Sequence, residues 1–497
     1  MARWWPAALA ALVVYRCLLG PPILTDESWF LQVVTRTVAG ETLYRDVFFG
    51  STPLAVWLAG PFALAGGGKL LALRALLALI QLAALALAGR LAAQLRLPGR
   101  GGLLLAALLF TLQHFSYYTP LAMMFLLACY SAALSWRATR APRWLALAAA
   151  AAALSAAAKY HVGLAACGAL LLTVLGDSSL PVRSRLQRAA LTCGLFAALT
   201  FLLLAPVLLS DAAPALADYV FLNKTRYVQL AVERFLPAVE LRKQLAAAGS
   251  LPHLLDLLDL LFSSYLLLLL TPLSLGVLAA AFRRAAAREP DRAWPALFFT
   301  AAGLSLLFPH ALFAHLLNAA PVLLLALAYA WGHLEKAPVW LSRAALAWVV
   351  CGWLWVGARP LAHILMTSKW VRATLHPYTG MWMNREHAER FGATVARLQD
   401  AMRAGKRPLL ITNDAGGLYL ATGLRNPTPF DLPASTALGR RGEEHLIAAI
   451  AAGRFPVVCL NEDWPGGAAP RRLIAFLRRH RQPGADLGSC VLYEAAP

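Results

Sequence analysis

Acidic residues follow the first long apolar run of the chain. Asp26 and Glu27 are adjacent, and Asp46 follows in the same loop, after Tyr44. Carboxylates at the mouth of a membrane span are costly to desolvate, so they are usually retained there for ion, proton or substrate chemistry. Such a carboxylate can act as a general base or position a reacting hydroxyl group. We therefore identify Asp26, Glu27 and Asp46 as candidate catalytic residues.

A purely structural role is the alternative for one of these carboxylates. The residue type of Asp26 suits the N-cap of a helix that begins at Ser28. Capping would explain Asp26 but neither Glu27 nor Asp46, so the sequence favours the functional interpretation.

Polar and cationic side chains near the predicted span ends could bind an anionic part of a substrate. The candidates are Tyr44, Arg74, Lys159, His161, His310 and His315. Each has an ordinary alternative: Lys159 could anchor a span end at the membrane surface, and Arg74 could contact a lipid headgroup. His315 shares a helix face with Asn318 and could be a satisfied core histidine.

The sequence contains no motif that is typical of a metal site. Three carboxylates could hold a hard cation, but the sequence contains no HxxxH, CxxC or DxD pattern. We therefore expect no cofactor and no metal ligands, while a divalent cation stays open.

The composition is that of a multi-pass membrane protein. The chain has 497 residues, of which 60% are hydrophobic and 14% charged, whereas soluble domains carry about 25% charged residues. Its net charge of +20 comes from short arginine clusters between apolar runs, where they orient spans by the positive-inside rule. We therefore expect membrane lipid as a partner and no nucleic acid, and we leave the oligomeric state open.

A span needs about 20 apolar residues, and the sequence offers about eleven candidates. They cover residues 4–24, 70–91, 103–114, 121–136, 144–158, 162–175, 190–209, 254–282, 294–308, 311–331 and 344–359. Residues 28–38 and 53–65 form shorter candidate helices that lie on the membrane, because the second is too short to cross it.

The arginine clusters also predict the orientation of the spans. Even-numbered spans end in Arg or Lys clusters, which indicates a cytoplasmic N-terminus. The loop 25–69 and the C-terminal segment then lie outside. The Ala-, Leu- and Arg-rich usage is typical of a bacterium with GC-rich coding, so we expect the bacterial inner (plasma) membrane.

From about residue 360 the composition changes to that of a soluble domain. Strand patterns around 407–414, 455–463 and 488–495 alternate with helical patterns over 386–403, 443–452 and 470–481. This order predicts a small extracytoplasmic α/β domain over 360–497, after an all-α polytopic domain over 1–359. Cys459 and Cys490 lie on two of its strands. We favour two buried thiols over a disulfide, which a Cα separation beyond about 7 Å would exclude.

The order of motifs at the N-terminus resembles the C-type (GT-C) membrane glycosyltransferases. The bacterial lineage similar to protein O-mannosyltransferases and the lipid A aminoarabinose transferase matches best. The matching residues are Asp26-Glu27, Gly40, Leu43-Tyr44, Asp46, Pro53-Leu54, Trp57-Leu58 and Arg74. Two further matches are Lys159 followed by Gly163, and His315 before Pro321.

The resemblance implies an enzyme that uses a polyprenyl-phosphate-linked sugar donor on the outer face, with Asp26 or Glu27 as the catalytic acidic residue. We expect inverting transfer of a hexosyl or pentosyl group to a glycan, lipid or protein acceptor. Lys159, His161 and His315 would meet the departing phosphate. The alternatives are a lipid-linked sugar flippase or transporter and a non-enzymatic scaffold. A transporter usually shows internal repeats and broken helices.

Overall fold

The computed structural model describes residues 5–19, 24–97, 117–222, 266–307, 313–333, 370–435, 437–438, 442–461 and 469–495. The chain divides into two compact units. The helical unit comprises residues 1–17, 77–205 and 228–361, and the mixed unit comprises residues 18–76, 206–227 and 362–497. The predicted spans 103–114 and 344–359 and the candidate His310 lie outside the described residues. The predicted domain boundary near residue 360 stays a prediction.

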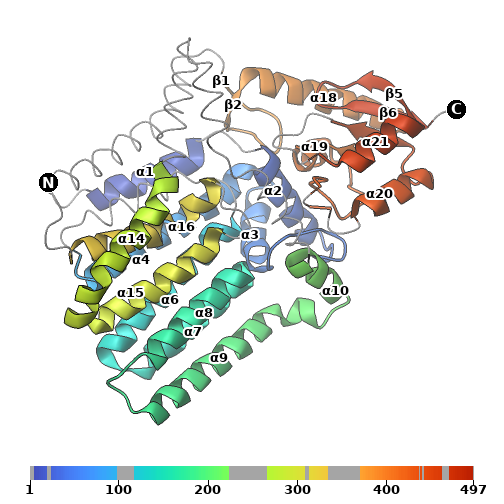
Figure 1. The fold of residues 1–497 in the computed structure, drawn as a ribbon. Helices are drawn as coiled ribbons and strands as arrows, with labels where there is room; N and C mark the ends of the chain where they lie inside the picture. The colour runs from blue at the N-terminus through green and yellow to red at the C-terminus, as the bar shows by residue number, and fades with distance from the viewer. Residues whose placement is uncertain are drawn as a thin grey trace. The chain divides into compact units, whose positions relative to one another are not determined.

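Long apolar helices build the helical unit (Figure 1). They are α1 (Trp5–Leu19), α4 (Leu70–Gln94), α6 (Tyr118–Thr139), α7 (Pro142–Ala158), α8 (Tyr160–Leu175), α9 (Val182–Leu208), α14 (Leu266–Arg288), α15 (Pro290–Gly303), the 3₁₀ turn η3 (Leu304–Leu307) and α16 (Phe313–Trp331). Helices α1, α4 and α9 each extend by a few residues into the mixed unit. Within the helical unit, α6 packs against α7, and α14 packs against α16.

Three of these helices, α4, α6 and α9, are long and apolar enough to cross a membrane. Large apolar side chains such as Leu191 and Leu202 on α9 are exposed, as expected for a surface that faces lipid. Together with the composition, these helices indicate a membrane protein. The number of spans stays a prediction.

Small residues let two helices approach closely in the helical unit. Helix α7 is rich in alanine, and a Cβ atom added to Gly163 of α8 would lie 2.1 Å from the Ala156 nitrogen of α7. Only glycine therefore fits at this crossing, which resembles the small-residue contacts of membrane helices. Between the two helices, the extended backbone of Lys159 makes the turn.

Charged residues gather at one end of α6. Arg137 pairs with Asp291 and with Asp177, and Arg140 also pairs with Asp177. At the opposite end of α6, Lys159 donates a hydrogen bond to Thr119 at 3.2 Å. The predicted inner arginine cluster and the predicted outer Lys159 thus lie at opposite ends of one helix, as the predicted topology requires. Which end faces the cytoplasm stays a prediction.

The mixed unit combines helices with two small sheets. Its helices are α2 (Leu24–Val38), α3 (Leu54–Ala65), α10 (Ala213–Leu216), the π-turn η1 (Ala217–Leu222), α18 (Arg385–Arg403), α19 (Ala415–Thr422), α20 (Gly442–Ala451) and α21 (Arg471–His480). Its strands are β1 (Trp370–Arg372), β2 (Trp382–Asn384), β3 (Leu409–Ile411), β4 (Val457–Leu460), β5 (Arg481–Asp486) and β6 (Val491–Ala495). Helix α2 packs against both α3 and α19.

The larger sheet has the strand order β3-β4-β6-β5. Strands β3 and β4 are parallel, with Leu410 opposite Cys459, and the other two pairings are antiparallel. Each predicted strand and helix after residue 380 is found, but β5 is absent from the prediction. Its residues RQPGAD are mostly exposed and polar, so no apolar alternation marks it.

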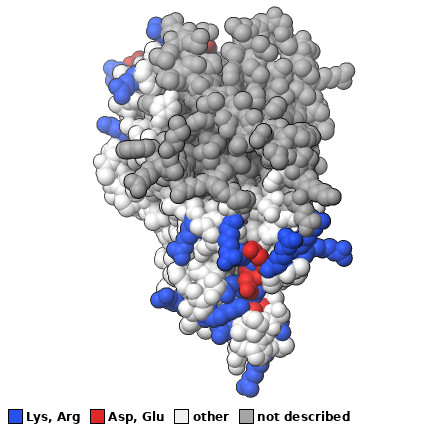
Figure 2. Space-filling model, turned by 90° about the vertical axis from the view of Figure 1, so that its left-hand side faces the viewer, with Lys and Arg blue, Asp and Glu red and all other residues white. Residues whose placement is uncertain are grey.

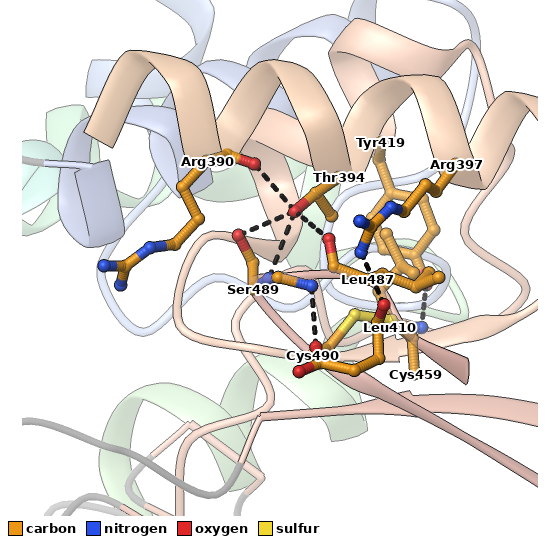
Figure 3. The surroundings of a disulfide bond; sticks show 11 residues. Arg390, Thr394, Arg397, Leu410, Tyr419, Cys459, Leu487, Ser489 and Cys490 are labelled. Carbon is orange, nitrogen blue, oxygen red and sulfur yellow. Dashed lines mark hydrogen bonds between the residues drawn. A yellow bond between two sulfur atoms is a disulfide. The ribbon is translucent and has the colours of Figure 1, made fainter. Parts of the chain in front are cut away.

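The expectation of two free thiols is wrong. Cys459 on β4 and Cys490 just before β6 form a disulfide, and their Cα atoms are 5.5 Å apart (Figure 3). The antiparallel pairing of β4 with β6 brings them together, because Cys459 lies opposite Leu492. The sequence alone could not supply this register.

Lys and Arg side chains gather around a few acidic ones toward the lower end of the face drawn in Figure 2. Residues other than Lys, Arg, Asp and Glu lie between these charged side chains.

Candidate active site

Helix α2 carries the adjacent acidic pair in its first turn. It begins at Leu24, so Asp26 and Glu27 are both helical. The interpretation of Asp26 as the N-cap of a helix starting at Ser28 is therefore wrong. Negative charges at this end of a helix interact favourably with the helix dipole, which helps two neighbouring carboxylates to share the turn.

Glu27 is held by Arg74 of α4. The Arg74 Nε donates to Glu27 Oε1 at 2.9 Å, and Nη2 donates to Oε2 at 2.6 Å. Both side chains are completely buried. Bidentate pairs of this kind are short, directional and strong, and breaking one leaves an uncompensated buried charge. Arg74 and Glu27, two residues singled out from the sequence, therefore meet each other.

Asp26 lies in a different environment. Its residue is partly exposed, and burial of the carboxylate together with the neighbouring charge of Glu27 raises its pKa from 3.8 to about 6. A carboxylate with a pKa near the working pH can both accept and release a proton. Asp26 is therefore the acidic residue of this pair that is suited to proton transfer.

Tyr44 and Asp46 belong to one tight turn. Tyr44 has a positive φ of 72°, is completely buried, and donates its hydroxyl hydrogen to the Ser51 carbonyl at 2.6 Å. Asp46 accepts hydrogen bonds from Arg45 and from the Thr42 amide, which lower its pKa to about 2. At neutral pH such a carboxylate is a weak base. Both side chains hold the loop in shape.

Asp414, which directly precedes α19, contacts α2 through a hydrogen bond. Asp414 Oδ1 accepts hydrogen bonds from the hydroxyls of Ser28 at 2.7 Å and Tyr378 at 2.8 Å. Burial raises the pKa of Asp414 to about 7, although these bonds and the Gly417 amide oppose the shift. A Cβ atom on Gly416 would lie 2.7 Å from the Ser28 carbonyl oxygen, so glycine is needed where α19 crosses α2.

Arg36 fixes the other end of α2. It donates to both carboxylate oxygens of Asp431 at 3.0 Å and to the carbonyls of Thr428 and Asp46 at 2.9 and 2.8 Å. It also pairs with Glu41. Asp414, Asp431 and Arg36 are not among the candidate residues predicted from the sequence. The one signal available was the position of Asp414, next to Asn413 at the end of a buried strand pattern.

Two of the predicted cationic residues, Lys159 and His161, lie in the helical unit. Lys159 is 3% exposed, bonds Thr119 and lies 5.8 Å from the centre of the Tyr118 ring. His161 packs edge-on against Tyr160 at 5.1 Å. His310 and the side chain of His315 lie outside the described residues. A common cavity for Asp26 and these cations stays a prediction.

Within the described ranges, no three His, Cys, Asp or Glu side chains gather as metal ligands would. The arrangement around α2 instead offers an acid–base group in Asp26 and a rigid, charge-neutralised support in Glu27 and Arg74. This combination suits proton transfer to or from a hydroxyl group.

No family model and no curated protein match the chain. Solved structures do. The crystal structure of ArnT from Cupriavidus metallidurans in the apo state matches 99% of this chain over 98% of its own length, with 14% identity and a TM-score of 0.58. The chain has the fold of a C-type glycosyltransferase.

Two further structures share this GT-C fold. ArnT from the same organism bound to undecaprenyl phosphate matches over the full length of both chains, with 15% identity and a TM-score of 0.56. The arabinofuranosyltransferase AftD from Mycobacteria matches all of this chain over 40% of its own length, with 15% identity and a TM-score of 0.50. The resemblance predicted from the first-loop motifs is thus confirmed at the level of the fold.

Proposed function

We propose that this protein transfers a sugar from a polyprenyl-phosphate donor to an acceptor hydroxyl, with inversion at the anomeric carbon. One observation carries the proposal. In a chain with the GT-C fold, the partly exposed residue Asp26, whose carboxylate has a pKa of about 6, stands beside a Glu27 that Arg74 engages with two hydrogen bonds.

In the proposed reaction, Asp26 accepts the proton of the acceptor hydroxyl. The acceptor oxygen forms a bond to the anomeric carbon while the bond from that carbon to the phosphate oxygen breaks. The lipid phosphate leaves on the opposite face with its negative charge. Lys159, His161 and His315 are the proposed partners of that charge, because cationic groups stabilise a developing anion.

The donor class is supported by a structural neighbour. ArnT from Cupriavidus metallidurans binds undecaprenyl phosphate, and its whole length aligns with this chain. The proposal does not specify the sugar or the acceptor, or whether a hexosyl or a pentosyl group is transferred.

The disulfide supports action on the outer face. Structural disulfides persist in oxidising compartments such as the bacterial periplasm and are rare in the cytosol. Cys459 and Cys490 lie in the same unit as Asp26. We therefore assign the mixed unit to the outer side of a bacterial inner membrane, with the N-terminus in the cytoplasm.

The test is transfer by membranes incubated with radiolabelled polyprenyl-phosphate sugars. Asp26→Asn should lower the rate by about 10²- to 10⁴-fold, as expected for the loss of a general base, while binding of the donor survives. Asp211→Asn is the matched control, because Asp211 is exposed and pairs only with the surface residue Arg45 among the described residues. Its rate should equal that of the wild type.

Near-full activity of Asp26→Asn at normal protein levels would refute the role of Asp26 and make Asp46 or Glu27 the better candidate. Movement of the labelled lipid across vesicles without transfer to any acceptor would instead support a flippase.

A further inference from the structure

A polar pocket lies within the mixed unit, at the ends of β3 and β4. It has a volume of about 610 Å³ and is lined by, among others, His387, Arg390, Thr412, Asp414, Asn461 and Ser489. Thr412 directly follows β3, and Asn461 directly follows β4. Open sheets commonly bind ligands beyond the carboxyl ends of their parallel strands, and the volume is in the range of small-molecule sites.

Buried polar atoms in this pocket lack partners. Thr412 is 1% exposed and Asp414 is 8% exposed. Within the described residues, no hydrogen bond reaches Thr412 Oγ1, Asp414 Oδ2 or His387 Nε2. Because buried polar groups are nearly always hydrogen-bonded, three such atoms lining one pocket indicate that a polar ligand completes the site.

The walls of the pocket are held rigidly. The Ser489 amide donates to Thr394 Oγ1 at 3.1 Å, and that hydroxyl lies 2.8 Å from the Leu487 carbonyl (Figure 3). These contacts tie the loop before β6 to α18, and the disulfide at Cys490 ties the same loop to β4. A site with fixed walls loses less entropy when it binds a ligand.

The charges in the pocket argue against an ionic ligand. Asp414 and Asp486 line it together with Arg390. Above pH 7, where Asp414 is ionised, the two carboxylates outnumber the one guanidinium, so an added anion such as phosphate would meet net repulsion. Burial and the nearby Arg390 lower the pKa of His387, which favours its neutral form. No metal-ligand cluster occurs among the described residues.

We propose that this pocket binds a neutral saccharide unit. Sugar hydroxyls both donate and accept hydrogen bonds, so one ring can donate a hydrogen bond to Asp414 Oδ2 and form others with Thr412 and His387. The pocket is separate from Asp26, but Asp414 joins it to α2 through Ser28. The proposal concerns binding alone and does not depend on the transfer reaction.

The test is a direct binding measurement on the full-length protein in detergent, without donor lipid. Glucose, mannose, galactose and arabinose are titrated separately by saturation-transfer NMR, with inorganic phosphate as the ionic comparison. At least one sugar should bind with a dissociation constant of about 0.1–10 mM, as expected for a ligand with few atoms. Thr412→Val and His387→Phe should each weaken binding by about 2- to 10-fold, through loss of one hydrogen bond.

Thr422→Val is the matched control, since this threonine lies on α19 away from the pocket lining and bonds the Leu418 carbonyl of its own helix. It should bind like the wild type. Thermal unfolding of each variant confirms that it is folded. If Thr412→Val does not fold, the binding measured for His387→Phe tests the proposal. The proposal is overturned if no sugar binds saturably, if phosphate binds more tightly than every sugar, or if the folded pocket variants bind like the wild type.

Discussion

Arg74 and Glu27 form a bidentate ion pair from which water is excluded. The two hydrogen bonds measure 2.9 and 2.6 Å, and neither side chain is exposed. Both oxygens of Glu27 are therefore engaged, whereas Asp26, one residue earlier, is a partly exposed residue. Because their surroundings differ, we expect the two carboxylates to have different roles, although their residue chemistry is nearly the same.

The Glu27–Arg74 pair should be essential for stability. Glu27→Gln alone leaves the Arg74 charge buried without a countercharge, which typically costs about 3–5 kcal/mol. We expect a lower midpoint of thermal unfolding for the detergent-purified protein. The double variant Glu27→Gln with Arg74→Met removes both charges and should lose less stability than the sum of the two single variants. Additive losses would show that the two side chains do not interact in this way.

The transfer rate should depend on the ionisation of Asp26. Its pKa of about 6 means that the base form predominates above that pH. The initial rate should therefore rise as the pH increases from 5 to 7 and then level off. The measurement is a series of initial rates with a saturating donor, and the residual activity of Asp26→Asn should lack this rise. A wild-type rate that is flat between pH 5 and 7 would exclude Asp26 as the base.

Lys159 should bind the donor phosphate. Replacement by methionine keeps the length and apolar stem of the side chain but removes the charge. We expect the donor concentration for half-maximal rate to rise by about 10- to 100-fold, the range for loss of a hydrogen bond to a charged group. The rate at saturating donor should change less. Lys69→Met is the control, because Lys69 is exposed. An equal effect of both substitutions would argue against a phosphate contact at Lys159.

Asp414 should make stability fall as the pH rises. Its pKa is about 7 in the folded protein against 3.8 for an aspartate exposed to solvent, so the folded state binds more protons between these pH values. The free energy of unfolding therefore decreases from about pH 4 to pH 7. Asp414→Asn keeps an oxygen for Ser28 and Tyr378 and cannot ionise. The difference between the unfolding midpoint of this variant and that of the wild type should therefore be more positive at pH 8 than at pH 5.

A matched variant checks the assignment of this pH dependence. Asp400→Asn changes an exposed aspartate that pairs only with its helix neighbour Arg403 among the described residues, and it should unfold with the pH dependence of the wild type. If Asp414→Asn also did so, Asp414 would be ionised in the folded protein at pH 5.

Local patterns in the sequence determined much of this protein. Apolar runs predicted the helices of the helical unit, since a helix satisfies its own backbone hydrogen bonds and needs no distant partner. The amphipathic period of residues 386–403 predicted α18 for the same reason. The spacing of Asp26-Glu27, Tyr44, Asp46 and Arg74 indicated the GT-C resemblance, which the fold comparison confirms.

Tertiary structure decided which of these residues contact one another and which are buried. Ser28 and Asp414 are 386 positions apart, and Arg36 and Asp431 are 395 apart, so nothing local in the sequence couples them. The β4–β6 register joined Cys459 to Cys490. The ion pair with Arg74 of α4 holds Glu27 in a buried position, whereas Asp26 is partly exposed. A pKa and a hydrogen-bond partner depend on the surrounding atoms, and only the folded chain brings those atoms together.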